Sequence, residues 1–181
     1  MKRQILHLGC GLNKKQGAIG VDINKNSQAD IIHDLNKFPY PFTSNKFDLI
    51  IAEHILEHLD DIPRVMKEIH RLGKNHAKIL IISSHFTSVD SFTDPTHKHF
   101  FTSRSFDYFI PGADLYKLRY SDSHFKKGSV VLGPPNHPNL LLKLILAAIN
   151  KKMIFYEKHF AFLFPVGVVK FELEVVKDKN G

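Results

Sequence analysis

Residues 5–11 are Ile5-Leu6-His7-Leu8-Gly9-Cys10-Gly11, and residues 18–23 are Ala18-Ile19-Gly20-Val21-Asp22-Ile23. The first stretch is a short apolar run that ends in two glycines, which is typical of a buried strand that enters a tight turn. The second predicts another strand, with a carboxylate at its end. Glycine lets the backbone approach a ligand closely, and a carboxylate accepts strong hydrogen bonds from hydroxyls such as those of a ribose. These residues alone leave two interpretations open: a ligand-binding turn, or an ordinary turn followed by a strand-ending acid.

The dinucleotide-binding fingerprint matches these residues poorly. It would require a third glycine at position 14, which is Lys14, and an acid about 20 residues further on. Asp22 follows Gly11 much sooner than that. The sequence therefore argues against a nicotinamide cofactor.

Strands alternate with helical or loop segments along the first half of the chain. Apolar runs predict three more strands, at residues 29–33, 47–52 and 77–83. A helix is predicted between the last two, because Asp60 and Asp61 suit its start, Pro63 its first turn and Gly73 its end. Its apolar positions share one face: Ile62, Val65, Met66, Ile69 and Leu72. Few residues separate the first three strands, so the crossover helices there are predicted to be reduced to turns.

The second half of the chain is more aromatic and carries fewer clear signals. A short helix is predicted from Thr102 through Phe109. We expect a sixth strand at residues 115–125, an apolar helix at 140–150 and a last strand at 171–176, paired with residues 160–164. Together the elements predict an α/β fold whose later part carries antiparallel strands.

Composition narrows the class of protein. The chain has 181 residues, one cysteine, 12 histidines and a formal net charge of +7. One cysteine excludes an internal disulfide and a cysteine-rich zinc site. The start does not resemble a secretory signal, and the longest apolar stretch is too short to span a bilayer, so we expect a cytoplasmic protein. The positive charge suggests anionic partners, but the lysines are scattered, and we do not expect nucleic acid to be the specific substrate.

Four motifs in order resemble those of class I S-adenosylmethionine-dependent methyltransferases, and the closest match is the group called methyltransferase type 11. The resemblance covers roughly residues 5–110. The motifs are Leu8-Gly9-Cys10-Gly11, Gly20-Val21-Asp22-Ile23, His33-Asp34-Leu35 leading to Pro39-Tyr40-Pro41-Phe42, and Phe47-Asp48-Leu49-Ile50-Ile51-Ala52-Glu53-His54-Ile55-Leu56-Glu57-His58-Leu59. The resemblance implies a single Rossmann-like domain with a mostly parallel sheet and an antiparallel C-terminal strand.

The resemblance also implies S-adenosylmethionine as the cofactor and gives roles to particular positions. Gly9 and Gly11 would pass close to its methionine part. Asp22 would hold the ribose hydroxyls, with Ile23 beside the adenine. Asp34 would face the adenine amine and the Leu35 backbone the ring, while Ala52 and Glu53 would bound the methionine side. Two family features are absent, a third glycine where Asn13 stands and an acid where His7 stands.

The segment Asp94-Pro95-Thr96-His97-Lys98-His99-Phe100-Phe101-Thr102 follows the fifth strand, whose carboxyl end borders the ligand crevice of an open α/β sheet. It resembles a segment that reaches over the active site in some type 11 methyltransferases. His97, His99 and Asp94 are therefore candidate catalytic residues on the acceptor side, with a histidine as general base. The alternative is a structural turn shaped by Pro95.

The histidines also invite a metal interpretation, because His54 and His58 are four residues apart. The glutamate between them is Glu57, which does not fit the metalloprotease pattern, so we expect no metal site. Cys10 is interpreted as a small packing residue.

The apolar helix at 140–150 and the aromatic residues after it predict either core or a cap over the substrate. A cap of this kind would admit a lipid or aromatic acceptor, or would rest on a membrane.

We expect one domain over residues 1–181, with residues 1–84 as the cofactor-binding half and residues 85–181 as the substrate side and C-terminal part. The predicted function is methyl transfer to a small-molecule or lipid-like acceptor. The alternatives are an RNA methyltransferase and a non-enzymatic module that binds S-adenosylmethionine or a partner.

Overall fold

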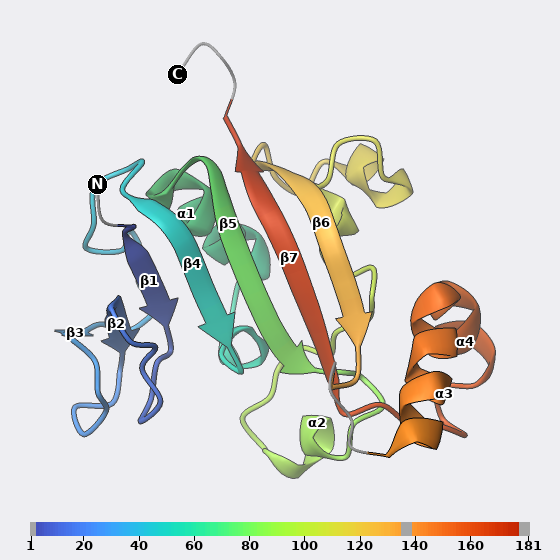
Figure 1. The fold of residues 1–181 in the computed structure, drawn as a ribbon. Coiled ribbons are helices and arrows are strands. Elements are labelled where there is room, and N and C mark those ends of the chain that lie inside the picture. Colours follow the sequence, from blue (N-terminus) through green and yellow to red (C-terminus); the bar gives the residue numbers. More distant parts are fainter. Residues whose placement is uncertain (1–2, 135–138, 178–181) are drawn as a thin grey trace.

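The computed structural model describes residues 3–134 and 139–177. Its described strands form one sheet in the order β3-β2-β1-β4-β5-β7-β6 (Figure 1). The strands are β1 (Ile5–Leu8), β2 (Ala18–Asp22), β3 (Ile31–Ile32), β4 (Phe47–Glu53), β5 (Gly73–Ser84), β6 (His124–Leu132) and β7 (Val168–Val176). Strands β1 to β5 pair in parallel, and β7 runs antiparallel between β5 and β6. This confirms the predicted mostly parallel, Rossmann-like sheet with an antiparallel C-terminal strand.

The helices are α1 (Ile62–Leu72), α2 (Asp90–Thr93), α3 (Leu140–Lys151) and α4 (Met153–His159), with 3-10 turns η1 (Leu56–His58), η2 (Asp107–Phe109) and η3 (Asp114–Leu118). Helix α1 is the predicted one. The Asp61 carboxylate accepts the amide of Arg64, and Pro63 lies in the first turn, so the start of α1 is capped as expected. Gly73 ends the helix in extended backbone and opens β5 directly.

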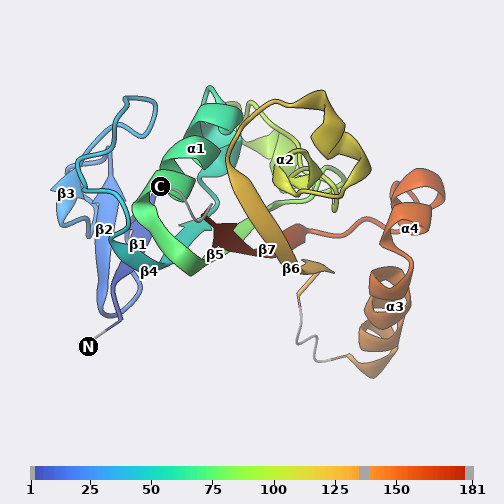
Figure 2. The same ribbon diagram turned by 90° about the horizontal axis from the view of Figure 1, so that it is seen from above.

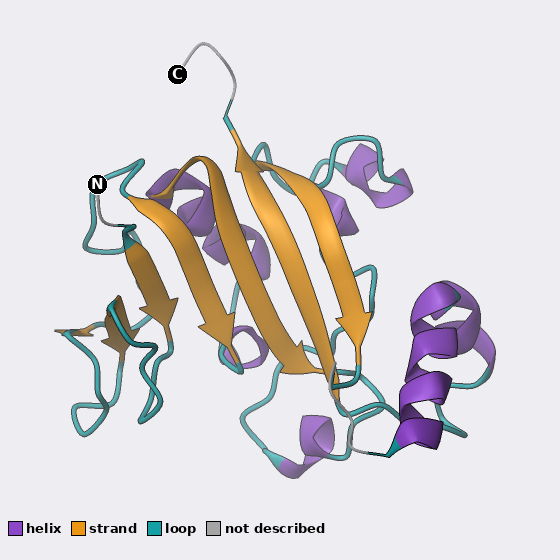
Figure 3. Ribbon diagram, viewed as in Figure 1, coloured by secondary structure: helices purple, strands orange, loops and turns teal. Residues whose placement is uncertain are grey.

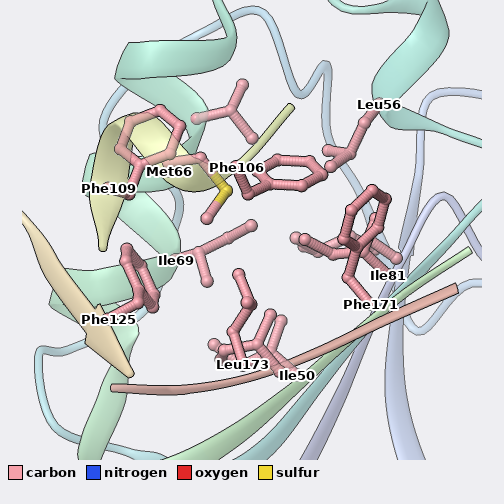
Figure 4. Packing of buried hydrophobic residues seen from close by; sticks show 14 of the residues in the cluster. Ile50, Leu56, Met66, Ile69, Ile81, Phe106, Phe109, Phe125, Phe171 and Leu173 are labelled. Atoms are coloured by element: carbon pink, nitrogen blue, oxygen red, sulfur yellow. The ribbon is translucent and has the colours of Figure 1, made fainter. Parts of the chain in front are cut away.

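The core lies between α1 and one face of the sheet. Figure 4 shows apolar side chains from α1, from the strands and from the segment around η2 that all point into this one space. The Phe106 and Phe171 rings meet edge to face, with centroids 4.7 Å apart. The segment after β5 therefore closes the core, as well as carrying the candidate acceptor residues.

The described helices leave one face of the sheet open. Turns connect β1 to β2 and β2 to β3, as predicted (Figure 3). Figure 2 shows α1, α2 and the segment around η2 on the same side of the central strands. On the opposite side the ion pairs Lys78–Glu174 and Lys170–Glu172 lie across the sheet surface. The polar side chains of β7 thus take the place of a second helical layer.

Three predictions for the C-terminal half are wrong. Residues 115–125 contain η3 and only the first residues of β6, because Arg119 adopts a left-handed backbone conformation that ends the turn. Residues 160–164 form the turn that follows α4, and β7 pairs with β5 and β6.

The third error concerns the predicted apolar helix, which forms as α3. It has no buried residue, so the interpretation of these leucines as core is wrong. Among the described residues, no helix is both long and apolar enough to cross a membrane.

Candidate active site

The glycine turn after β1 is shaped by two residues with left-handed backbone. Gly9 has φ +62°, and a Cβ there would lie 2.5 Å from Cγ1 of Ile55, so its missing side chain lets the turn after β4 pack against it. Gly11 has φ +49°, and a Cβ there would meet no atom within 4 Å. Gly9 thus serves packing, whereas Gly11 faces open space in which a ligand can approach the backbone.

Asp22, at the end of β2, joins that strand to the glycine turn. One carboxylate oxygen accepts the Gly11 amide at 2.8 Å, and the other accepts the Asn24 amide at 2.8 Å. Each carboxylate oxygen has two acceptor sites, so both oxygens retain capacity for a ligand's hydroxyl groups. Asp22 is therefore held in place by the backbone at the carboxyl edge of the sheet, where ligands of open α/β sheets bind.

Polar contacts hold the turn that replaces the first crossover helix. The Lys15 amide donates to Nδ1 of buried His7, and the Lys15 ammonium lies 2.9 Å from a Glu53 carboxylate oxygen. Lys14 pairs with Asp30 at 2.8 Å. His7, where the family's usual acid is missing, thus contributes to holding the loop.

The other predicted cofactor residues lie at the same edge of the sheet. Ile23 is 65% exposed, an unusual state for a large apolar side chain beside a buried strand. Asp34 accepts the Asn36 amide within a turn, and Leu35 is buried, with its carbonyl bound to the Tyr40 hydroxyl. Ala52 is buried in β4, next to Glu53.

Glu57 connects the end of β4 to the predicted acceptor segment. Its carbonyl accepts the amides of Lys98 and His99, at 2.7 and 3.2 Å. Its side chain is only 1% exposed and contacts the His54 ring at 3.3 Å. Residues 94–99 are therefore docked on η1, beside the carboxyl ends of the parallel strands.

The candidate catalytic residues have different surroundings within this segment. The His97 Nδ1 lies 3.1 Å from the Ser91 carbonyl, and the His99 Nε2 lies 2.8 Å from the Leu59 carbonyl. Asp94 is exposed and accepts both the amide and the hydroxyl of Thr96. These contacts hold both histidine rings at defined positions and leave each with one further ring nitrogen.

Comparison with known proteins agrees with this geometry. Residues 6–81 match the family model of the methyltransferase domain, methyltransferase type 11. Residues 6–81 therefore resemble a methyltransferase domain of this type. This match agrees with the family that the sequence motifs resemble.

Solved structures share the fold at low sequence identity. An S-adenosylmethionine-dependent methyltransferase from Mesorhizobium loti is 15% identical, with a TM-score of 0.57, over 94% of this chain and 90% of that one. One from Archaeoglobus fulgidus is 22% identical, with a TM-score of 0.53, over 95% of this chain and 86% of that one. The phosphoethanolamine N-methyltransferase 2 of Haemonchus contortus, in complex with S-adenosyl-L-methionine, is 16% identical, with a TM-score of 0.57, over 97% of this chain and 49% of that one. The comparison with curated proteins gave no match.

The residues at this edge of the sheet fit S-adenosylmethionine, the cofactor that the sequence motifs imply. The open space beside Gly11 suits a ligand that lies against the backbone, and the Asp22 carboxylate is placed to accept ribose hydroxyls. Two exposed apolar side chains, Leu12 and Ile23, flank these groups and would be covered by a purine ring. Cys10 is buried and burial raises the pKa of its thiol, which agrees with its interpretation as a packing residue.

Sequence reasoning missed several residues of this region. Lys15 and Thr96 gave no signal of their own, because their partners lie far away along the chain. Glu57 and His58 were noticed only as neighbours of His54. Glu57 and His58 gain their roles from contact with residues 94–99, which are distant in the sequence and are brought near only by the fold.

Glu57 and His54 shift each other's protonation. The hydrogen bond to Glu57 raises the pKa of His54 above 6.5. Burial favours the neutral form of the Glu57 carboxyl, but its hydrogen bonds, that from His54 the strongest, and the nearby charge of His54 together outweigh burial and keep the pKa of Glu57 below 4.5. His54 also has φ +51°, a conformation that is uncommon outside glycine and that marks the end of β4 as a special position.

We predict that Asp22→Asn weakens S-adenosylmethionine binding about tenfold or more. Hydrogen bonds to a charged group contribute about 1.5–3 kcal/mol, and the amide retains only one acceptor oxygen. Isothermal titration calorimetry measures the change. Asp48→Asn is the matched control, since Asp48 also accepts a backbone amide, that of Gln4, but at the amino end of β4. Equal binding by Asp22→Asn and wild type would contradict the assignment of Asp22 to the ribose.

The His54–Glu57 pair should make stability depend on pH in a defined direction. The pair stabilises the fold fully at a pH between the unfolded-state pKa of Glu57, about 4.5, and that of His54, about 6.5. This stabilisation is lost as the pH rises through the folded-state pKa of His54, or falls through that of Glu57. In NMR titrations Glu57→Gln should lower the pKa of His54 relative to wild type. An unaltered His54 titration would show that the pair does not form.

Proposed function

We propose that this methyltransferase domain transfers the methyl group of S-adenosylmethionine to a lipid-like acceptor. The observation that carries the proposal is an apolar groove of about 430 Å³ between α3 and residues 163–167. Its lining contains no charged or hydrogen-bonding side chain: Gly133, Pro134, Leu142, Ile145, Leu146, Ile149, Leu163, Phe164, Pro165, Val166 and Gly167. Its size falls within the range of small-molecule sites, and only an apolar ligand gains by entering it.

Helix α4, which joins α3 to residues 163–167, contacts residues on both sides of the candidate acceptor segment. The Glu157 carboxylate of α4 lies 3.2 Å from the His85 ring and accepts both the amide and the hydroxyl of Ser103. The Phe86 and Phe162 rings meet at 5.5 Å. In this proposal an acceptor with its chain in the groove extends past these flanking residues toward His97 and His99.

A basic hollow adjoins the same helices. It is about 710 Å³ in volume, and its lining includes Lys151, Lys152 and Lys158. The one carboxylate in its lining, Asp107, is paired with Lys127 and Arg104. The three further lysines favour an acceptor, or a surface that presents it, with an anionic headgroup.

In this proposal residues 1–84 bind the cofactor and residues 85–181 bind the acceptor. The sulfonium methyl group of the cofactor is already activated, so the protein mainly aligns the acceptor with the S–CH₃ axis. Positioning of this kind can supply about 7–11 kcal/mol of a barrier. A ring nitrogen of His97 or His99 that is not bound to a carbonyl would take the proton that the acceptor loses.

The relative from Haemonchus contortus supports only the anionic headgroup of such an acceptor, since its name gives phosphoethanolamine, a phosphorylated amine without an apolar chain. The alternative of an RNA methyltransferase gains less support. The lysines of the basic hollow are gathered beside apolar side chains such as Phe155 and Ile154 rather than along an extended groove.

A transfer assay tests the acceptor class. The protein is incubated with methyl-labelled S-adenosylmethionine and a total lipid extract, and label is expected in the organic phase. Leu142→Gln and Ile145→Gln should reduce it about tenfold or more, because burial of such a side chain contributes about 1.5–3 kcal/mol. Leu118→Gln, a half-exposed leucine of η3, is the control. Label that enters only water-soluble products or RNA would refute a lipid-like acceptor.

Substitution of the two histidines tests their place on the acceptor side. His97→Ala and His99→Ala should leave cofactor affinity within a few-fold of wild type, while at least one lowers turnover about 10²-fold or more, as for loss of a general base. Calorimetry and initial rates measure the two effects separately. Full turnover in both variants would rule out the base. Loss of cofactor affinity in proportion to turnover would place the segment on the cofactor side.

A further inference from the structure

Three potential metal ligands meet where residues 94–99 dock on η1. His58, Asp94 and His97 each offer one ligand atom, and these atoms all lie within 4.8 Å of one another. The rings of His58 and His97 have centroids 4.6 Å apart. We propose that His58, Asp94 and His97 form a binding site for a divalent transition-metal ion, with Zn²⁺ as the ion that suits it best.

The fold holds the three ligands from two segments that are distant in the sequence. His58 belongs to η1, whereas Asp94 and His97 follow α2. The two segments are fastened by the backbone bonds from Lys98 and His99 to the Glu57 carbonyl, and the Lys98 ammonium pairs with Asp60 at 2.5 Å. The ligands therefore do not depend on one flexible loop for their proximity.

Hydrogen bonds prepare both histidines for coordination. The Thr96 hydroxyl donates its one hydrogen to Asp94, so the His58 Nδ1, at 2.8 Å from the same hydroxyl, must be the donor of that contact. The His97 Nδ1 likewise donates to the Ser91 carbonyl at 3.1 Å. In each neutral ring the Nε2 then carries a lone pair. Metal-bound histidines almost always donate their other ring nitrogen in this way.

The donor set selects the class of ion. Two imidazoles and one carboxylate suit zinc and its first-row neighbours, whereas Mg²⁺ and Ca²⁺ require oxygen ligands. Zinc bonds of about 2.0–2.2 Å put ligand atoms about 3.3 Å apart in a tetrahedral site. The proposal requires the half-buried rings and the exposed Asp94 side chain to rotate and close the remaining separation when the ion binds.

Three protein ligands leave a coordination position open, as in catalytic rather than structural zinc sites. An acceptor hydroxyl or headgroup oxygen that takes this position would lose its proton at a lower pH. This role rests on the proposed methyl transfer, and it would make His97 a ligand, with His99 left as the candidate base. Binding of the ion itself does not depend on any acceptor or on S-adenosylmethionine.

Zinc titration of the tag-free, chelator-treated protein tests the site without an activity assay. Wild type should bind one Zn²⁺ per chain at micromolar zinc and should not bind Mg²⁺. His58→Ala, His97→Ala and Asp94→Asn should each abolish this binding or weaken it at least about 10–100-fold. Thr96→Val keeps all three ligands but loses the hydroxyl that orients His58 and Asp94, and it should weaken binding about 10–100-fold, the usual effect of such partners.

The matched control is His76→Gln. His76 also pairs with a carboxylate, that of Glu174, but on the other side of the sheet from α1, and its loss should leave zinc affinity unchanged. Circular dichroism confirms that each variant is folded. Absence of stoichiometric zinc binding by wild type, or equal loss in His76→Gln and the ligand variants, overturns the proposal. Zinc binding without any methyl transfer would leave the metal site standing and refute only the proposed function.

Discussion

The candidate site depends on one buried carboxylate, that of Glu57. A charge removed from water is costly unless it is paired and hydrogen-bonded. The ring of His54, when protonated, supplies the opposite charge at one carboxylate oxygen, and the Ser84 amide approaches the same oxygen at 3.4 Å. The backbone carbonyl of Glu57 accepts the amides of Lys98 and His99. Ile55, two positions before Glu57, fills the space beside Gly9. Through this turn the position of the glycine loop and that of the acceptor segment become linked.

The open face of the sheet explains the unusual polarity of the cofactor side. Where crossover helices would normally hold the ends of β1 and β2, the chain has only turns. Helices stabilise such ends by burying apolar surface, and turns of this length cannot. Hydrogen bonds and ion pairs of Asp22, Lys14 and Lys15 take over that task. Exposed ion pairs contribute little individually, so the loop relies on several of them acting together with the left-handed glycines.

The sequence predicts the first half of this fold well and the second half poorly, for a physical reason. Strands β1, β2 and β4 are buried in a parallel sheet, and their apolar runs are bounded by glycine and acids. The residues before β6 instead form a turn whose apolar side chains, Leu118 and Tyr120, remain exposed, so hydrophobicity misplaced the strand. The predicted cofactor residues follow strand ends, so a local sequence pattern is enough to propose them. The association of His58 with Asp94 and His97 is a tertiary contact with no local pattern, and the sequence instead favoured no metal.

The helices α3 and α4 are held in a way that leaves their apolar surface free for a ligand. The polar contacts of α4 are buried, because His85 is fully inaccessible and its partner Glu157 also binds Ser103. Burial favours the neutral form of Glu157, yet these hydrogen bonds keep its pKa below the usual range. Replacing such a network by apolar residues often leaves the folding stability unchanged or raises it. The network is therefore more important for fixing one orientation of α4 than for stability. Because polar groups fix this orientation, the leucines of α3 do not have to be buried to hold the helices in place. They stay exposed along the groove in which the proposed acceptor chain would lie.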